Sequence, residues 1–209
     1  MRDTHSGFWT GLYTRNEIFI WLSAAIFLGS IIVTYAFSGF LDAYLAPALQ
    51  NFQQKQSEGI LKLETLSLFL NNVTIAFYIY LGGLVFGVFT VFFLVSNGVF
   101  IGYAASKFPL GSFIIFTIPH GIFEVSGIIL AGAGGFKLCN IVINFLKDAT
   151  KIKSNISIKN QLSYILSTNV DDFKDSLALF IIAVVLLIIA AFIEANFSVT
   201  WGTYIQSSF

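Results

Sequence analysis

The stretch from Val73 to Tyr103 carries no charged side chain, and this constrains the fold more than any other feature of the sequence. It exceeds the roughly 20 apolar residues that one helix needs to cross a hydrocarbon core of about 30 Å. Of the 209 residues, 56% are hydrophobic and 11% are charged, whereas a soluble domain carries about a quarter charged residues. The chain therefore has too few polar groups to cover a surface that faces water. We predict an all-α, polytopic helical membrane bundle that forms a single domain over residues 1–209.

About five membrane spans are expected. Asn97-Gly98 is a strong turn signal inside the uncharged stretch, so a full span is predicted before it and a short helix after it. A ten-residue helix rises only about 15 Å, and the short helix is therefore either a tilted extra span or part of a broken, re-entrant element. Pro119 follows inside the next span, where its ring removes a backbone donor and is expected to kink the helix. The predicted spans are residues 18–40, 73–95, 99–108 (short), 113–135 and 176–195.

Two polar segments separate these spans. Residues 42–67 carry apolar side chains at helical spacing and are expected to lie along the membrane surface. Residues 136–175 form a second, amphipathic segment that includes six lysines. The N-terminal arm holds Arg2 and Arg15, and the positive-inside rule then places the N-terminus and residues 136–175 in the cytoplasm. Five crossings of the cell membrane satisfy this distribution, whereas four crossings would put the two basic segments on opposite sides.

Four ionisable residues fall within or beside the spans: Lys107, His120, Glu124 and Glu194. Each such residue adds at least about 2.5 kcal/mol to the free energy of membrane insertion at the bilayer centre, so we expect each of them to have a structural or functional role. His120 and Glu124 are four residues apart and share one helix face. We predict that these two and Glu194 face the bundle interior as one polar site, with His120 between the carboxylates. Lys107 is expected within reach of Glu124. Such a cluster either handles protons, metal or a lipid headgroup, or only fixes the packing of the helices.

Whether the cluster binds a metal stays open at this stage. His120 and Glu124 supply two zinc ligands, and Glu194 is the intramembrane carboxylate left to complete the three that a catalytic site uses. No second histidine lies near them in the sequence, since the other one is His5. The sequence also has no glycine-rich phosphate loop and no Gly-x-Ser-x-Gly elbow. We expect no cofactor and no enzymatic activity.

Two pairs of glycines occur at the four-residue spacing that lets helices approach closely. Gly83 and Gly87 form one pair, and Gly98 and Gly102 form the other. We expect them at helix contacts within the chain, and a contact face between two copies is the alternative.

The order of these residues resembles the stage II sporulation protein M family of small multi-span membrane proteins. Pro119-His120-Gly121-Ile-Phe-Glu124 inside a span is the most specific match, and the likeness covers the chain from about residue 15 onward. One departure is Thr200-Trp201, where family members tend to carry Thr-Pro after the final glutamate. The other matching residues are Asn72, Gly83 and Gly87, then Asn97, Gly98 and Gly102, and lastly Ala191-Phe-Ile-Glu194.

The resemblance implies a role in a membrane complex rather than a reaction. In spore-forming bacteria, the member that gives the family its name works in a complex that drives peptidoglycan remodelling, and it is not known as a hydrolase. We therefore expect a scaffold or accessory subunit of an envelope complex, with a membrane protein or a second copy of the chain as its partner. The alternatives are a small transporter or lipid-handling subunit and an intramembrane metal-dependent hydrolase. The net charge of zero gives no reason to expect nucleic acid binding.

Overall fold

The computed structural model describes residues 7–58, 64–150 and 158–208, and every regular element in these ranges is helical. Five of the helices are long and apolar enough to cross a membrane, which confirms the predicted all-α bundle with about five spans. A 3-10 turn, η1 (Gly82–Val85), follows α3, and a π turn, η2 (Glu194–Ser198), joins α6 to α7. The helices are α1 (Phe8–Ala36), α2 (Ser38–Ser57), α3 (Thr65–Leu81), α4 (Val88–Ser106), α5 (Leu110–Ala149), α6 (Ile158–Ile193) and α7 (Val199–Ser208).

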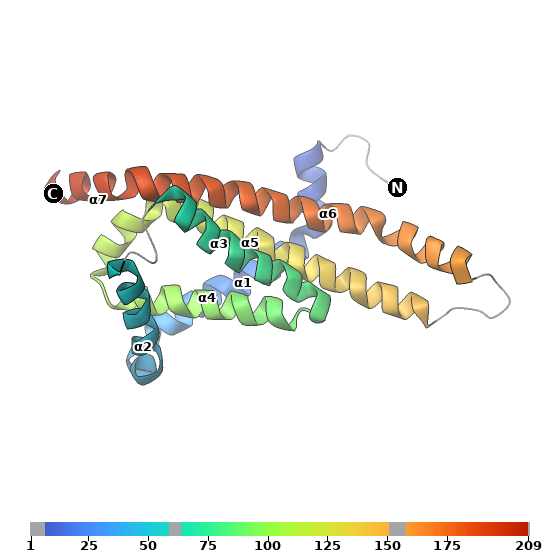
Figure 1. Ribbon diagram of the computed structural model, residues 1–209, viewed down its shortest axis with the longest axis horizontal. Coiled ribbons are helices and arrows are strands. Elements are labelled where there is room, and N and C mark those ends of the chain that lie inside the picture. The colour runs from blue at the N-terminus through green and yellow to red at the C-terminus, as the bar shows by residue number, and fades with distance from the viewer. Residues whose placement is uncertain (1–6, 59–63, 151–157, 209) are drawn as a thin grey trace.

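The chain folds back and forth along the long axis of the molecule (Figure 1). Helices α3, α4, α5 and α6 run roughly along this axis, and α5 and α6 lie side by side. Helix α2 lies near the end of the bundle where α4 ends and α5 begins. The C-terminal ends of α5 and α7 lie at opposite ends of the molecule.

The apolar core lies where α1, α3, α4, α5 and α6 meet, so all five candidate spans contribute to it. This core combines small residues with large ones, which lets the helices pack closely. Its fully buried side chains are Phe27, Ala76, Ile79, Leu94, Ile128, Ala131, Ala183 and Leu187.

The turn predicted at Asn97-Gly98 is wrong, because α4 runs unbroken through these residues. The chain turns earlier, at η1, where Phe86 and Gly87 both adopt left-handed backbone conformations with φ angles of 53° and 74°. Glycine adopts such angles without steric cost, so the turn favours a glycine at position 87. The two spans are therefore Thr65–Val85 and Val88–Ser106. The predicted full span over 73–95 and short helix over 99–108 are replaced by two helices of similar length.

The predicted separation between the span at 113–135 and the amphipathic segment at 136–175 is also wrong. Helix α5 continues without interruption from Leu110 to Ala149, and α6 already begins at Ile158. The polar segment is therefore mostly an extension of two spans, and its residues 151–157 lie outside the described part of the chain. Helix formation continues because the sequence from Phe136 to Ala149 keeps an apolar stripe and contains no proline or glycine.

The glycines at four-residue spacing bring helices together inside the chain. A Cβ atom on Gly98 would lie 2.7 Å from the carbonyl oxygen of Phe27, and one on Gly102 would overlap the backbone of Ile31. Both contacts join α4 to α1. A Cβ atom on Gly83 would likewise overlap the backbone of α5 at Gly135. These positions allow the backbones to approach as closely as small residues permit in membrane helices.

Two ion pairs join the middle of α6 to two other helices. The guanidinium group of Arg15 donates two hydrogen bonds, of 2.6 and 2.7 Å, to the carboxylate of Asp175. The ammonium group of Lys137, which is 6% exposed, lies 2.8 Å from the carboxylate of Asp172. These pairs connect α6 to α1 and to α5, and their charges would be costly to bury without partners.

We predict that Gly102→Ala destabilises the fold, because the new methyl group would push α1 away from α4. Overpacking of this kind costs about 1–3 kcal/mol, so the midpoint of thermal unfolding in detergent should fall by several degrees. Gly29→Ala is the matched control, because Gly29 is also helical and no atom lies within 4 Å of its Cβ position. The control should be neutral or stabilising, since alanine favours a helix over glycine by about 0.5–1 kcal/mol. Equal midpoints for the two variants would contradict the close α1–α4 contact.

Candidate intramembrane polar site

Two residues of the site lie on α5 just after its proline. Pro119 is inside α5, and the first turns of this helix run in a different direction from the rest (Figure 1). Proline removes one backbone hydrogen bond and is a common cause of such bends. His120 and Glu124 follow one helical turn apart, so both side chains leave the same face of α5.

The third residue, Glu194, is the first residue of the π turn η2. A π turn holds one residue more than an α-helical turn, and such turns are frequent at functional sites. The last residue of η2, Ser198, is 4% exposed. The Ser198 hydroxyl lies 2.8 Å from the Nδ1 atom of His120, and it also donates a 3.4 Å hydrogen bond to the carbonyl oxygen of Ile193. The turn therefore contributes two polar groups to the same place.

The structure brings His120, Glu124 and Glu194 together. One atom from each side chain, a ring nitrogen or a carboxylate oxygen, lies within 4.8 Å of the other two. Among the described residues, no protein group donates a hydrogen bond to either carboxylate, and no lysine or arginine pairs with them. Two negative charges this close repel each other, and the apolar surroundings strengthen the repulsion. The pair therefore needs a proton or a cation between the helices.

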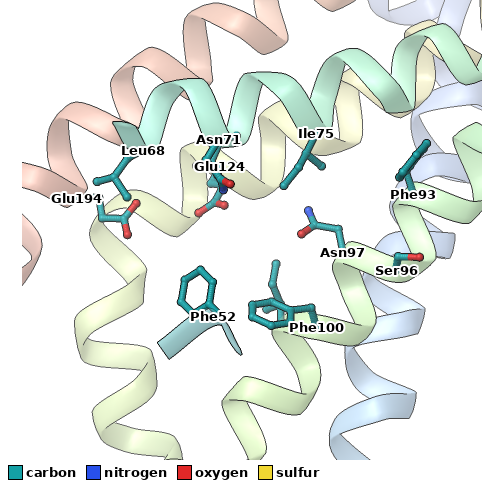
Figure 2. Close-up of a pocket in the computed structure, with 12 residues that line it drawn as sticks. Phe52, Leu68, Asn71, Ile75, Phe93, Ser96, Asn97, Phe100, Glu124 and Glu194 are labelled. Carbon is teal, nitrogen blue, oxygen red and sulfur yellow. The ribbon is translucent and has the colours of Figure 1, made fainter. Parts of the chain in front are cut away.

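Glu124 and Glu194 face a cavity of about 370 Å³. Figure 2 shows that their carboxylates and the amide of Asn97 point toward the same space. The ring of Phe52 from α2 lies on the other side of this space, 5.3 Å from the ring of Phe100. A cavity of this volume can hold several water molecules or a small polar group, because one water occupies about 30 Å³. The remaining lining residues are Leu68, Asn71, Asn72, Ile75, Phe93, Ser96 and Ile101.

The prediction that Lys107 reaches Glu124 is wrong. Its ammonium group pairs with the carboxylate of Asp42 and lies 4.7 Å from the centre of the Tyr103 ring. Asp42 also accepts a 2.8 Å hydrogen bond from the Tyr103 hydroxyl. The hydrogen bonds from Lys107 and Tyr103 hold the pKa of Asp42 below its usual value. Lys107 follows the last residue of a full-length α4, so it emerges at the end of the bundle, where it fastens α2 to α4.

The other residues singled out from the sequence have separate roles. Asn72 and Asn97 line the cavity, whereas Gly87 forms the turn before α4. Gly121 is buried on α5, next to His120. The remaining residues, Gly83, Gly98 and Gly102, lie at the helix contacts described above.

Sequence reasoning missed Ser198 and Phe52. Ser198 comes four residues after Glu194, and this helical spacing was the available signal for a polar partner. No comparable signal marks Phe52, because its position beside the cavity depends on how α2 folds back onto α4.

Several comparisons with known proteins bear on this arrangement. The model of the family described as "Stage II sporulation protein M" matches residues 18–199. The chain is 27% identical over 191 residues to the uncharacterized protein MJ0706 of Methanocaldococcus jannaschii. This match covers 87% of this chain and 82% of the relative. It is 30% identical over 144 residues to the uncharacterized protein MJ0793 of the same organism. This second match covers 66% of this chain and 73% of the relative. No solved structure matches the chain significantly.

Proposed function

The chain belongs to the stage II sporulation protein M family, and we propose that it works as a non-enzymatic scaffold or accessory subunit of an envelope or membrane-remodelling complex. The observation that carries this proposal is the inward placement of its polar site. The cluster of His120, Glu124 and Glu194 connects α5 to the end of α6. The outer faces of the spans offer large apolar side chains instead, such as Trp21 on α1 and Phe92 on α4. Surfaces of this kind suit packing against other membrane helices, where van der Waals contact drives association.

The arrangement around His120 favours a non-enzymatic role. Among the described residues, Ser198 is the hydroxyl that pairs with this histidine, as a serine nucleophile would. Ser198 is nevertheless buried, donates its proton to a backbone carbonyl and is absent from the cavity lining. A metal-dependent hydrolase also needs a general base besides its three ligands, and the lining residues include no further carboxylate or histidine.

We expect the chain to be part of a larger assembly when it is extracted from its native membrane in a mild detergent. Light scattering should then give a protein mass above that of one chain, and chemical cross-linking before extraction should preserve it. The same chain produced in an unrelated host provides the control. A larger mass only in the native preparation identifies a different protein as the partner, and a larger mass in both identifies a second copy. A single-chain mass in both preparations contradicts the scaffold proposal.

Transport of a proton or small cation is the second candidate function, and the cavity beside Glu124 and Glu194 favours it. Half-buried carboxylates beside a cavity that can hold several water molecules are typical groups of intramembrane ion pathways. We expect vesicles that contain the purified chain to dissipate a pH gradient faster than vesicles with Glu124→Gln. Glu17→Gln serves as the matched control, because Glu17 is an exposed residue near the start of α1. Equal rates for the wild type, the Glu124→Gln variant and protein-free vesicles would exclude proton transport.

We also propose that the C-terminal end of α5 lies in the cytoplasm and the end of α7 lies outside. The basic residues support this orientation, because Arg15, Lys137 and Lys147 all lie toward the end of the bundle where α5 finishes. In a chain that carries Cys139→Ser, we expect Lys147→Cys to react with an impermeant maleimide only after the membrane is opened. Ser207→Cys, at the opposite end, should react in intact cells, since both positions are exposed. The reverse labelling pattern would overturn the orientation.

A further inference from the structure

We propose that His120, Glu124 and Glu194 bind one divalent ion of a first-row transition metal, such as Zn²⁺, inside the bundle. The three donor atoms already lie within 4.8 Å of one another. Imidazole nitrogen and carboxylate oxygen are ligands that Zn²⁺ accepts, and three protein ligands with one open position are a common arrangement. The proposal goes beyond the scaffold role and does not depend on it, because a bound metal ion is compatible with a subunit that has any partner.

Charge balance supports a divalent cation at this place. The two carboxylates bring two negative charges into an apolar environment, and among the described residues no lysine or arginine pairs with them. One divalent ion neutralises both charges, as two protons also would, whereas a single proton or a monovalent cation would leave one charge uncompensated. Complete neutralisation is strongly favoured where water is scarce.

The hydrogen bonds of Ser198 leave the second ring nitrogen of His120 available to a metal. When the Ser198 hydroxyl donates its 3.4 Å hydrogen bond to the carbonyl oxygen of Ile193, it accepts a hydrogen bond from the ring. In the tautomer that matches this arrangement, Nδ1 of His120 carries the ring proton and Nε2 keeps a free lone pair. Metal-binding histidines typically donate their other ring N–H to a neighbouring oxygen in this way, which fixes the tautomer and the ring orientation. Ser198 is therefore a positioning residue for the proposed site.

The types of donor atom, one imidazole nitrogen and two carboxylate oxygens, favour a transition metal over a hard cation. Two ligands at about 2.1 Å from Zn²⁺ in tetrahedral geometry are about 3.4 Å apart, so donors that lie within 4.8 Å of one another would approach by up to about 1.4 Å on binding. Ca²⁺ and Mg²⁺ prefer six or more oxygen ligands, and an imidazole nitrogen is a poor choice for them. The fourth position of the ion would face the cavity, because Glu124 and Glu194 both line it.

The proposal is tested with Zn²⁺ itself on the full chain, purified in detergent through a tag without histidine and freed of metal by a chelator. Equilibrium dialysis with elemental analysis should give about one Zn²⁺ per wild-type chain. Glu124→Gln and Glu194→Gln should each weaken binding by at least about tenfold, and Ser198→Ala should weaken it by about 10–100-fold. His5→Asn and Glu17→Gln are matched controls that remove the other histidine and an exposed carboxylate, and they should bind like the wild type.

Two further measurements keep the result decisive if a glutamate variant fails to fold. Zn²⁺ should raise the thermal unfolding midpoint of the wild type and of both controls, because a ligand that binds only the folded state stabilises it. Bound Co²⁺ should give the visible absorption of a low-coordinate nitrogen and oxygen site, and Ser198→Ala should alter it. Binding well below one ion per chain, binding unchanged in both glutamate variants, or full displacement by equal Mg²⁺ would each overturn the proposal. In those cases the two carboxylates hold protons instead.

Discussion

The structure depends on the scarcity of water inside a bundle whose five spans are almost entirely apolar. In such surroundings every backbone group has to find its partner within its own helix, which explains why the described chain contains no strand. Polar side chains face the same requirement, and they meet one another instead of facing the apolar exterior. Glycines keep water out of the helix contacts. At Gly98 and Gly102, α4 approaches α1 so closely that there is room for neither a side chain nor a water molecule.

Much of this arrangement could be predicted from the sequence. The long uncharged runs determine the number of spans, and the cost of an intramembrane carboxylate requires Glu124 and Glu194 to face inward. The turn between α3 and α4 could not be predicted in the same way. Asn97 and Gly98 look like a turn because such pairs usually meet water, whereas here the asparagine faces a cavity and the glycine contacts α1. The misplaced turn also produced the error at Lys107, since the depth of that residue depends on where its helix begins.

The cavity connects the fold to the polar site, because four separate helices and the π turn contribute to its walls. Helix α2 closes one side through Phe52, and it is fastened to α4 by the contacts of Asp42 with Lys107 and Tyr103. A segment outside the five spans thus borders the site that the spans create. A partner or lipid that moved α2 would change access to Glu124 and Glu194 without touching either of them, and this would link the proposed accessory role to an internal site.

The π turn at Glu194–Ser198 determines where the C-terminal part of such a chain can change in length by one residue. Because the π turn holds one residue more than an α-helical turn, removal of one residue there would restore a regular α-helix and leave the residues after it in nearly the same orientation. Gly202 in α7 now lies against the ring of Phe116 at the start of α5, in a space that accepts no side chain. A one-residue deletion in the regular helix between Ser198 and Gly202 would rotate this glycine away by about 100° and bring a larger residue into its place. Loss of a single residue should therefore be tolerated within the π turn and be rare between Ser198 and Gly202.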